Sequence, residues 1–315
     1  MLIIHLSDLH LCRKNRPQNL NYTRRLLEYG LENGGDHFVV TGDITQDSNP
    51  DDFLDFRDLL QEYGLLRSDK VSLVIGNHDI YGGVYLASDI ATFPDRCKTT
   101  DYSEKVKAFR DYFFETFEGI HPPIFNDGMV YAKCVSNVLF VAFNSNDRYS
   151  LFKNPFSAAG NVTKNQLKEL KRIFEIDSYR NCVKILLTHH HFNEPYKKYS
   201  NIKKRAFKYV EEQGNHLRHR KRLMTLLRKN NVGLILHGHV HESVEYSKRG
   251  IRFLNAGGSI DKNRPGELKI NFISVKSGRI QTEIRTIPAQ EHVPRILEFP
   301  NPIAESANMR TPMLS

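Results

Sequence analysis

Cysteine is scarce in this sequence of 315 residues, which contains only four. They are scattered and form no C-x-x-C pair, so neither a disulfide framework nor a cysteine-based zinc site is expected. A reducing cytoplasm is the expected compartment for such a chain. The four positions are Cys12, Cys97, Cys134 and Cys182.

Long hydrophobic runs are also absent. No stretch approaches the roughly 20 apolar residues that a membrane-spanning helix needs. The first residues, 1–4, are apolar but lead directly into Asp8 and His10, without a basic segment, a long apolar core or a cleavage site. We therefore expect no secretory signal.

Hydrophobic residues at 40% and charged residues at 26% suit one large or two modest globular domains.

The positive charge of the chain is local. The net charge is +9, but residues 197–229 hold twelve Lys or Arg against two Glu, a surplus of ten, so the remainder sums to about −1. The stretch fits a solvated helix face, a surface that attracts a phosphate-rich substrate, a nucleic-acid contact or an anionic-membrane contact. Interleaved Tyr196, Tyr199 and Tyr209 favour a nucleotide-like ligand through stacking. No known nucleic-acid-binding motif is present.

Hydrophobic periodicity predicts alternating strands and helices in the first quarter of the chain. Short apolar runs indicate buried strands, and apolar residues at helical spacing indicate the helices between them. This β-α-β-α-β order implies right-handed crossovers and largely parallel strands. The predicted strands are 2–6, 37–41 and 71–75, and the predicted helices are 19–33 and a segment that begins at Pro50 and includes Leu60.

The later chain is less regular. An aromatic-rich insertion at 80–128 is predicted to hold one helix near 103–117, and the tail after Ile287 is rich in proline. A capping box at Thr163 and Gln166 starts a helix that extends to about 175. A further helix is expected near 216–230. The remaining predicted strands are 129–134, 138–143, 183–188 and 232–236, followed by antiparallel strands at 242–247, 251–255, 267–275 and 279–286.

Five predicted strands end in the same way, with a small residue followed by Asp, Asn or His. Because such ends gather at one edge of a sheet, we expect their side chains to form one metal site. The five blocks are Ser7-Asp8-Leu9-His10, Gly42-Asp43, Gly76-Asn77-His78-Asp79, Thr188-His189-His190-His191 and Gly238-His239-Val240-His241.

The residue types indicate two ions rather than one. Carboxylate oxygens suit hard divalent cations, and mid-row transition metals also accept imidazole nitrogens. Asp43 can bridge two ions through its two oxygens. Seven ligands are too many for one tetrahedral zinc but suit a pair of ions about 3.5–4 Å apart. The seven candidates are Asp8, His10, Asp43, Asn77, His189, His239 and His241.

In this order, the five blocks resemble the calcineurin-like metallophosphoesterases over residues 1–260. The resemblance implies an α/β fold, a four-layer αββα sandwich of two mixed β-sheets with helices on the outside and the site at the strand ends. We expect one such domain over 1–287, cap insertions at about 80–128 and 192–215, and an irregular tail at 288–315.

The resemblance also implies roles for individual residues. Asp43 would bridge two manganese, iron or zinc ions, and a hydroxide between the ions would attack phosphorus. His78 would give a proton to the leaving oxygen or stabilise the phosphorane, and Asp79 would orient a histidine. The first histidine of 189–191 is the expected ligand, whereas His5 and His237 are expected to be core residues. Asp8, His10 and His241 would bind the first ion, and Asn77, His189 and His239 the second.

A second likeness concerns the substrate. Gly160 with Gln166, together with the turns at 144–146 and 255–259, is similar to the bacterial cyclic-nucleotide phosphodiesterase branch of the family. This favours a small phosphodiester, such as a cyclic nucleotide, over a phosphoprotein. A nuclease and a pyrophosphatase of a nucleotide-linked lipid are the alternative enzymes, although His78 stands where the lipid enzymes tend to carry Arg. A nucleic-acid-binding module and an inactive scaffold are the non-enzyme alternatives, but no expected ligand is missing.

Overall fold

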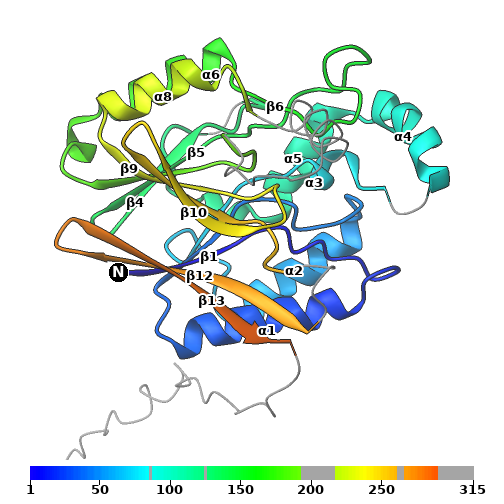
Figure 1. Ribbon diagram of the computed structural model, residues 1–315, viewed down its shortest axis with the longest axis horizontal. Coiled ribbons are helices and arrows are strands. Elements are labelled where there is room, and N and C mark those ends of the chain that lie inside the picture. Colours follow the sequence, from blue (N-terminus) through cyan, green and yellow to red (C-terminus); the bar gives the residue numbers. More distant parts are fainter. Residues whose placement is uncertain (85–86, 124–125, 193–216, 261–265, 290–315) are drawn as a thin grey trace, which may run out of the picture.

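Two β-sheets lie face to face in the computed structural model, with helices on both outer sides (Figure 1). The structure describes residues 1–84, 87–123, 126–192, 217–260 and 266–289. Helices α1 and α2 cover the first sheet, and α6 and α8 cover the second. The predicted four-layer sandwich of two mixed sheets is confirmed.

The first sheet contains the predicted β-α-β-α-β segment. Strands β1, β2 and β3 are parallel, with α1 (Gln18–Glu32) and α2 (Pro50–Glu62) as the crossovers. β12 pairs antiparallel with β1, so β1 lies inside the sheet between segments far apart in sequence. The strand order is β13 (Arg279–Pro288), β12 (Glu267–Lys276), β1 (Leu2–Leu6), β2 (His37–Val40) and β3 (Val71–Leu73).

The second sheet differs from the prediction at its end. Strands 242–247 and 251–255 were expected to continue as antiparallel strands, but β11 pairs parallel with β9. The β10–β11 hairpin forms as expected, and its second strand is the one that contacts β9. Local sequence specifies a hairpin but not which of its strands joins the sheet. The order is β10 (Ser243–Lys248), β11 (Ile251–Ala256), β9 (Val232–His237), β7 (Val183–Leu187), β5 (Val138–Ala142) and β4 (Tyr131–Val135).

Helices α6 (Lys164–Phe174) and α8 (Arg220–Lys229) cover this sheet. The capping box of Thr163 and Gln166 is present at the start of α6, and a short 3-10 helix, η2 (Asp177–Tyr179), follows the helix. α8 begins later than predicted because Leu217–Arg218 forms β8, which pairs with β6 (Gly160–Asn161). The two short strands therefore lie at the starts of both helices.

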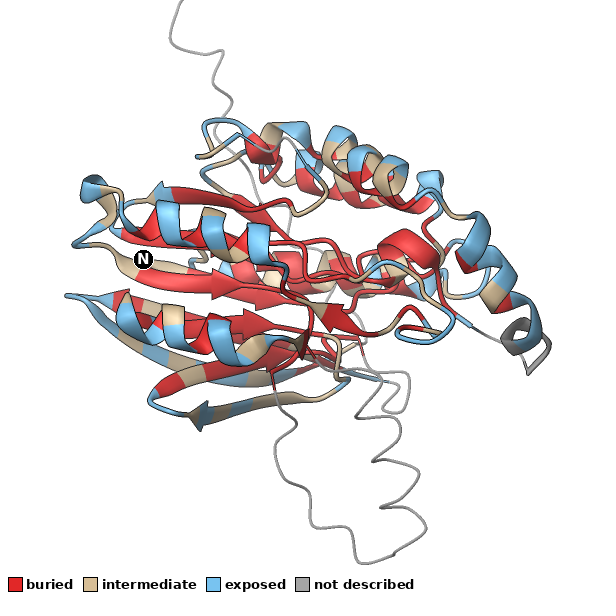
Figure 2. Cartoon of the chain, turned by 90° about the horizontal axis from the view of Figure 1, so that it is seen from above, coloured by how far each residue is buried: buried red, intermediate tan, exposed pale blue. Residues whose placement is uncertain are grey.

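The core follows the two-residue period of the strands. In β5, Leu139 and Val141 pack under α6 and α8, whereas Phe140 and Ala142 point into the core between the sheets. Figure 2 shows the buried strands inside and the exposed residues on the outer helix faces. Both faces of this strand are buried, so its sequence is a continuous apolar run.

The first insertion contains more helix than expected. The one helix predicted near 103–117 is wrong in two respects: the chain also forms α4, and α5 stops before a 3-10 helix, η1. Pro94 inside α4 disfavours a helical interpretation of that segment. Asp101 caps α5 by accepting the backbone N–H of Glu104. The elements are α3 (His78–Tyr81), α4 (Ala87–Thr99), α5 (Tyr102–Tyr112) and η1 (Phe114–Phe117).

The aromatic residues of this insertion join the main core. Phe113 is fully buried, and its ring lies 5.3 Å from that of Phe109 and 5.8 Å from that of Phe56 on α2. Arg57 on α2 also donates to the carbonyl of Tyr112 at 2.6 Å. The described part of the insertion is thus packed against the first helical layer.

Most of the second predicted insertion, at 192–215, and most of the tail, at 288–315, lie outside the described residues. Among the helices that the structure describes, none has the length and apolar composition to span a membrane. The four cysteines are free thiols.

We expect Phe113→Ala to lower the free energy of unfolding by about 3–5 kcal/mol, because it leaves a cavity among packed aromatic rings. Phe114→Ala is the matched control: Phe114 is 54% exposed, and its loss is expected to cost less than about 1 kcal/mol. Urea unfolding followed by circular dichroism measures both. Equal, small effects would show that the insertion is not part of the main core.

Candidate metal centre

The two sheets bring the predicted ligands together at one edge. The strand-end loops are tied to one another: the amide of Gly238 donates to the carbonyl of His189 at 3.0 Å, and the amide of His239 donates to Asp8 Oδ2 at 3.0 Å. Ligands follow β1, β2 and β3 of the first sheet and β7 and β9 of the second. They form three overlapping groups: Asp8, His10 and His241; His10, Asp43 and His78; and Asp43, His189 and His239.

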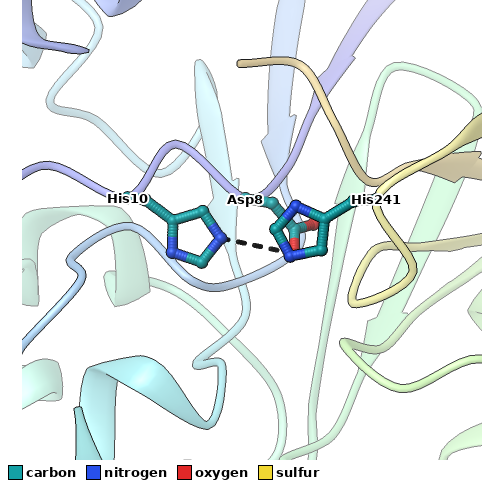
Figure 3. Close-up of side chains that lie close together, drawn as sticks. All are labelled: Asp8, His10 and His241. Carbon is teal, nitrogen blue, oxygen red and sulfur yellow. Dashed lines mark ion pairs between the residues drawn. The ribbon is translucent and has the colours of Figure 1, made fainter. Parts of the chain in front are cut away.

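The first group has buried polar atoms without partners. Figure 3 shows the side chains of Asp8, His10 and His241 converging, with His10 Nε2 at 3.9 Å from Asp8 Oδ1. Asp8 Oδ2 accepts the amide of His239, but Asp8 Oδ1 and both ring nitrogens of His10 have no hydrogen-bond partner among the described residues. Such buried atoms are costly unless something binds them. A metal ion fits here.

The group of Asp43, His189 and His239 is tighter, and Asn77 joins it. Asn77 Oδ1 lies 3.0 Å from His189 Nε2 and 3.1 Å from His239 Nδ1, and these two nitrogens are 3.2 Å apart. Asp43 Oδ2 lies 3.4 Å from His189 Nε2. Ligand atoms about 2.1 Å from one ion lie roughly 3.0–3.4 Å from each other in octahedral or tetrahedral coordination. The four atoms therefore fit around one ion.

Asp43 links the groups, since it belongs to two of them. Its Oδ1 accepts the amide of His78 at 2.9 Å, and its Oδ2 faces His189. The backbone therefore orients Asp43 through Oδ1, while Oδ2 faces the candidate ligand histidines. Bridging of two ions by Asp43 stays a prediction.

His78 and Asp79 differ in their surroundings. His78 Nδ1 lies 3.1 Å from the carbonyl of Gln46, Nε2 lies 4.0 Å from Asp43 Oδ2, and the side chain is 22% exposed. Asp79 is buried and was predicted to orient a histidine. Instead, Oδ1 accepts the amide and hydroxyl of Thr45 at 2.8 and 3.2 Å, and Oδ2 accepts the amide of Gly76 at 2.9 Å. Asp79 therefore joins the loops after β2 and β3.

Burial and neighbouring charges set the pKa values at the site. Burial alone would lower the pKa of His189, but the Asp43 carboxylate outweighs this and raises it. Burial would raise the pKa of Asp43, and His189 outweighs this and lowers it. Burial lowers the pKa of His10 and of His239 well below the usual value, which favours the neutral ring, the form that binds metals. Burial and then Asp43 raise the pKa of Asp79.

The other histidines have hydrogen-bond partners within the protein. His190 Nδ1 lies 2.8 Å from Ser145 Oγ and its Nε2 lies 3.1 Å from the carbonyl of Ala158, so of the sequential histidines it is His189 that faces Asn77. His5 Nε2 lies 3.0 Å from Thr41 Oγ1, and His237 Nε2 lies 3.0 Å from the hydroxyl of Tyr246. These last two are core residues, as expected.

The backbone is strained where it carries the ligands. Asp8, His10, Asp43 and His239 all have positive φ, between 49° and 70°. Non-glycine residues rarely adopt this conformation, and it costs of order 1–3 kcal/mol each. Gly76 is required for a different reason: a Cβ there would lie 2.2 Å from both the nitrogen and Oδ1 of Asp43. Gly42 and Gly238 are crowded in the same way, so glycine at these three positions permits close approach of the loops.

A cleft of about 430 Å³ opens over the ligands. Its lining has a polar part, with two residues that sequence analysis did not identify, Arg16 and Gln46, because neither lies in a strand-end motif. Its other part is apolar. The lining includes His10, Asn77, His78 and His241 on the ligand side and Val84, Phe93 and Phe156 on the apolar side.

A family model described as calcineurin-like phosphoesterase matches residues 1–243. The chain belongs to this family. Membership makes it a phosphoester hydrolase of the metallophosphoesterase type, and the three ligand groups fit a dinuclear centre. A comparison with curated proteins finds no match.

Solved structures agree on the fold of this calcineurin-like phosphoesterase. A dimetal phosphatase from Danio rerio superposes with a TM-score of 0.60 at 12% identity, covering 92% of this chain and 99% of that one. Purple acid phosphatase PPD1 from yellow lupin seeds superposes with a TM-score of 0.54 at 12% identity, covering 90% of this chain and 51% of that one. At such identities the likeness concerns the fold.

We expect Gly76→Ala to lower metal affinity by roughly 10–100-fold, because the new Cβ must displace Asp43. Isothermal titration of the metal-free protein with Mn²⁺ measures this. Gly233→Ala is the control, since a Cβ there would meet only the end of the Ile280 side chain, at 3.1 Å. Unchanged affinity in Gly76→Ala would contradict the close approach.

Asp79→Asn is expected to lower the free energy of unfolding by about 1–3 kcal/mol, since an amide nitrogen would face a backbone donor that the carboxylate now accepts. Urea unfolding is compared with that of Asp95→Asn, a residue whose side chain is 79% exposed. Normal stability combined with lost activity would instead assign Asp79 a direct catalytic role.

Proposed function

We propose that this calcineurin-like phosphoesterase hydrolyses small phosphodiesters at a two-metal centre. The observation that carries the proposal is the chain of three ligand groups, linked by His10 and Asp43, at the base of a cleft that is partly apolar. In this proposal Asp43 serves both ions, which are manganese, iron or zinc. Asp8, His10 and His241 hold one ion, and Asn77, His189 and His239 hold the other.

Bound ions would supply positive charge for the phosphoryl oxygens and an activated water. The chain itself positions the remaining groups. His78 Nδ1 donates to the carbonyl of Gln46, which fixes the ring and leaves Nε2 for the cleft. In the protonated ring, Nε2 gives a proton to the leaving oxygen or stabilises charge on the phosphorane. Asp79 holds the loop that presents Asn77 and His78.

The lining of the cleft favours a diester over a monoester. A monoester carries up to two negative charges, but Arg16 is the only Lys or Arg among the described lining residues. A diester carries one charge and two organic substituents. Val84, Phe93 and Phe156 offer an apolar surface for a substituent such as a nucleobase. A cyclic nucleotide or another small diester is therefore the proposed substrate.

Asp43→Asn tests the centre. We expect the turnover of bis(p-nitrophenyl) phosphate with Mn²⁺ to fall at least about 100-fold, because the charge that holds the ions is lost. EDTA should abolish wild-type turnover, and Asp95→Asn should retain it. Turnover of p-nitrophenyl phosphate is measured alongside. Cleavage of the monoester alone would overturn the diester preference, and full activity of Asp43→Asn would overturn the metal centre.

Phe156→Ala tests the apolar side of the cleft. Phe156 is 65% exposed without substrate, and burying an aromatic side chain against a substituent contributes about 1.5–3 kcal/mol. We expect KM for bis(p-nitrophenyl) phosphate to rise about tenfold with little change in kcat. Phe114→Ala serves as the exposed-aromatic control. A fall in kcat without a rise in KM would show that Phe156 does not bind the substituent.

A further inference from the structure

A basic groove of about 760 Å³ lies at the starts of α6 and α8, beside β6 and β8. It is separate from the metal cleft. The described lining contains no carboxylate and is unusually rich in cationic residues. The basic groove comprises Asn161, Val162, Thr163, Lys164, Leu167, Arg218, His219, Arg220, Lys221 and Arg222.

Little of the charge of the basic groove is neutralised by the residues that the structure describes. Lys164, Lys221 and Arg222 are exposed, and they form no ion pair among the described residues. The first turn of α8 is basic and holds no acidic residue, although the start of a helix favours negative charge. Arg220 extends the positive field further, because it contributes, after burial, to the lowered pKa of Lys248. An anionic ligand would offset this repulsion.

One loop connects the basic groove to the metal cleft. Arg218 forms an ion pair with Asp147 and donates to the carbonyl of Lys153 at 3.2 Å, so it fixes the loop 147–158 from the groove side. The other end of the loop lines the metal cleft through Phe156 and Ala158. The loop, in green in Figure 1, projects from the molecule beside β6.

This loop exposes aromatic side chains between the two sites. Phe152 is 92% exposed and Phe156 is 65% exposed, and Leu151 beside them is 59% exposed. Exposed aromatic rings next to a cationic groove are the two parts of a single-strand nucleic-acid site: the groove holds backbone phosphates, and the rings stack with bases. A duplex keeps its bases stacked internally, so it offers no free base to these rings.

We propose that single-stranded nucleic acid binds across this surface, with backbone phosphates in the basic groove, bases on Phe152 and Phe156, and one phosphodiester at the metal centre. The inference rests on the proposed hydrolysis of phosphodiesters and extends the substrate from a small diester to one diester of a nucleic-acid strand. The loop 147–158 then positions the strand between the basic groove, which binds the phosphates, and the metal centre, which hydrolyses the diester. The groove cations bind the strand and take no part in the chemical step.

The test is binding without hydrolysis. Fluorescence anisotropy follows a fluorescein-labelled oligothymidylate of roughly 12 nucleotides with protein in EDTA. We expect the triple variant Lys164→Gln/Lys221→Gln/Arg222→Gln to bind at least tenfold more weakly. The slope of log K against log salt should fall in magnitude by about 2, since each lost phosphate contact to a single strand contributes about 0.7.

The matched control is Lys229→Gln/Lys276→Gln/Arg279→Gln, which removes the same charge from exposed positions outside the groove. It should bind within twofold of the wild type. Phe152→Ala should bind about tenfold more weakly with an unchanged salt slope, because stacking releases no counterions. Phe152 is 92% exposed, so this variant keeps the test valid even if the triple variant fails to fold.

Three results would overturn the inference: no binding by the wild type, equal weakening in both triple variants, or duplex bound as tightly as the single strand. Competition by pyrophosphate at equal phosphate concentration would show a small-phosphate site instead. Loss of binding to phosphatidylglycerol vesicles in Phe152→Ala, with oligothymidylate binding unchanged, would show a membrane surface. Turnover of bis(p-nitrophenyl) phosphate by the wild type tests the proposed function separately.

Discussion

The buried carboxylate of Asp43 is the group around which the site is arranged. A desolvated charge is costly unless hydrogen bonds and opposite charges surround it. Here the first sheet supplies the His78 amide and the second supplies His189. The loops must therefore approach closely from both sides, which explains the glycine at position 76 and the left-handed backbone of Asp43 itself. The two sheets must therefore pack closely for the Asp43 carboxylate to have its partners.

Sequence patterns predicted the features that depend on neighbouring residues, namely the strands and the polar residues at their ends. Short apolar runs and the polar residues that follow them identified the strand ends, and the parallel arrangement placed those ends together. The features that sequence analysis missed depend on distant segments. Asp79 contacts Thr45 across two loops, and β11 rather than β10 contacts β9. α4 was missed because Pro94 lies in its interior, where proline disfavours a helix.

The site combines two environments within one cleft. Its base presents nitrogen and oxygen ligands, and its wall presents Val84, Phe93 and Phe156. In the proposed function, the ligand side would bind the phosphoryl group and the wall would contact what is attached to it. The loop 147–158 belongs to both this cleft and, through Arg218, to the basic groove. The loop therefore contacts both surfaces without containing any of the candidate ligands.

The position of β1 has a consequence for the timing of folding. β1 leads into the first candidate ligands, yet it lies between β2 and β12, so its antiparallel partner is Glu267–Lys276. A ribosome must produce nearly all of the described chain before this strand has both neighbours. Until then, one edge of β1 lacks its antiparallel partner. Pairing between segments so far apart in sequence forms slowly, and an unpaired strand edge favours aggregation in the meantime.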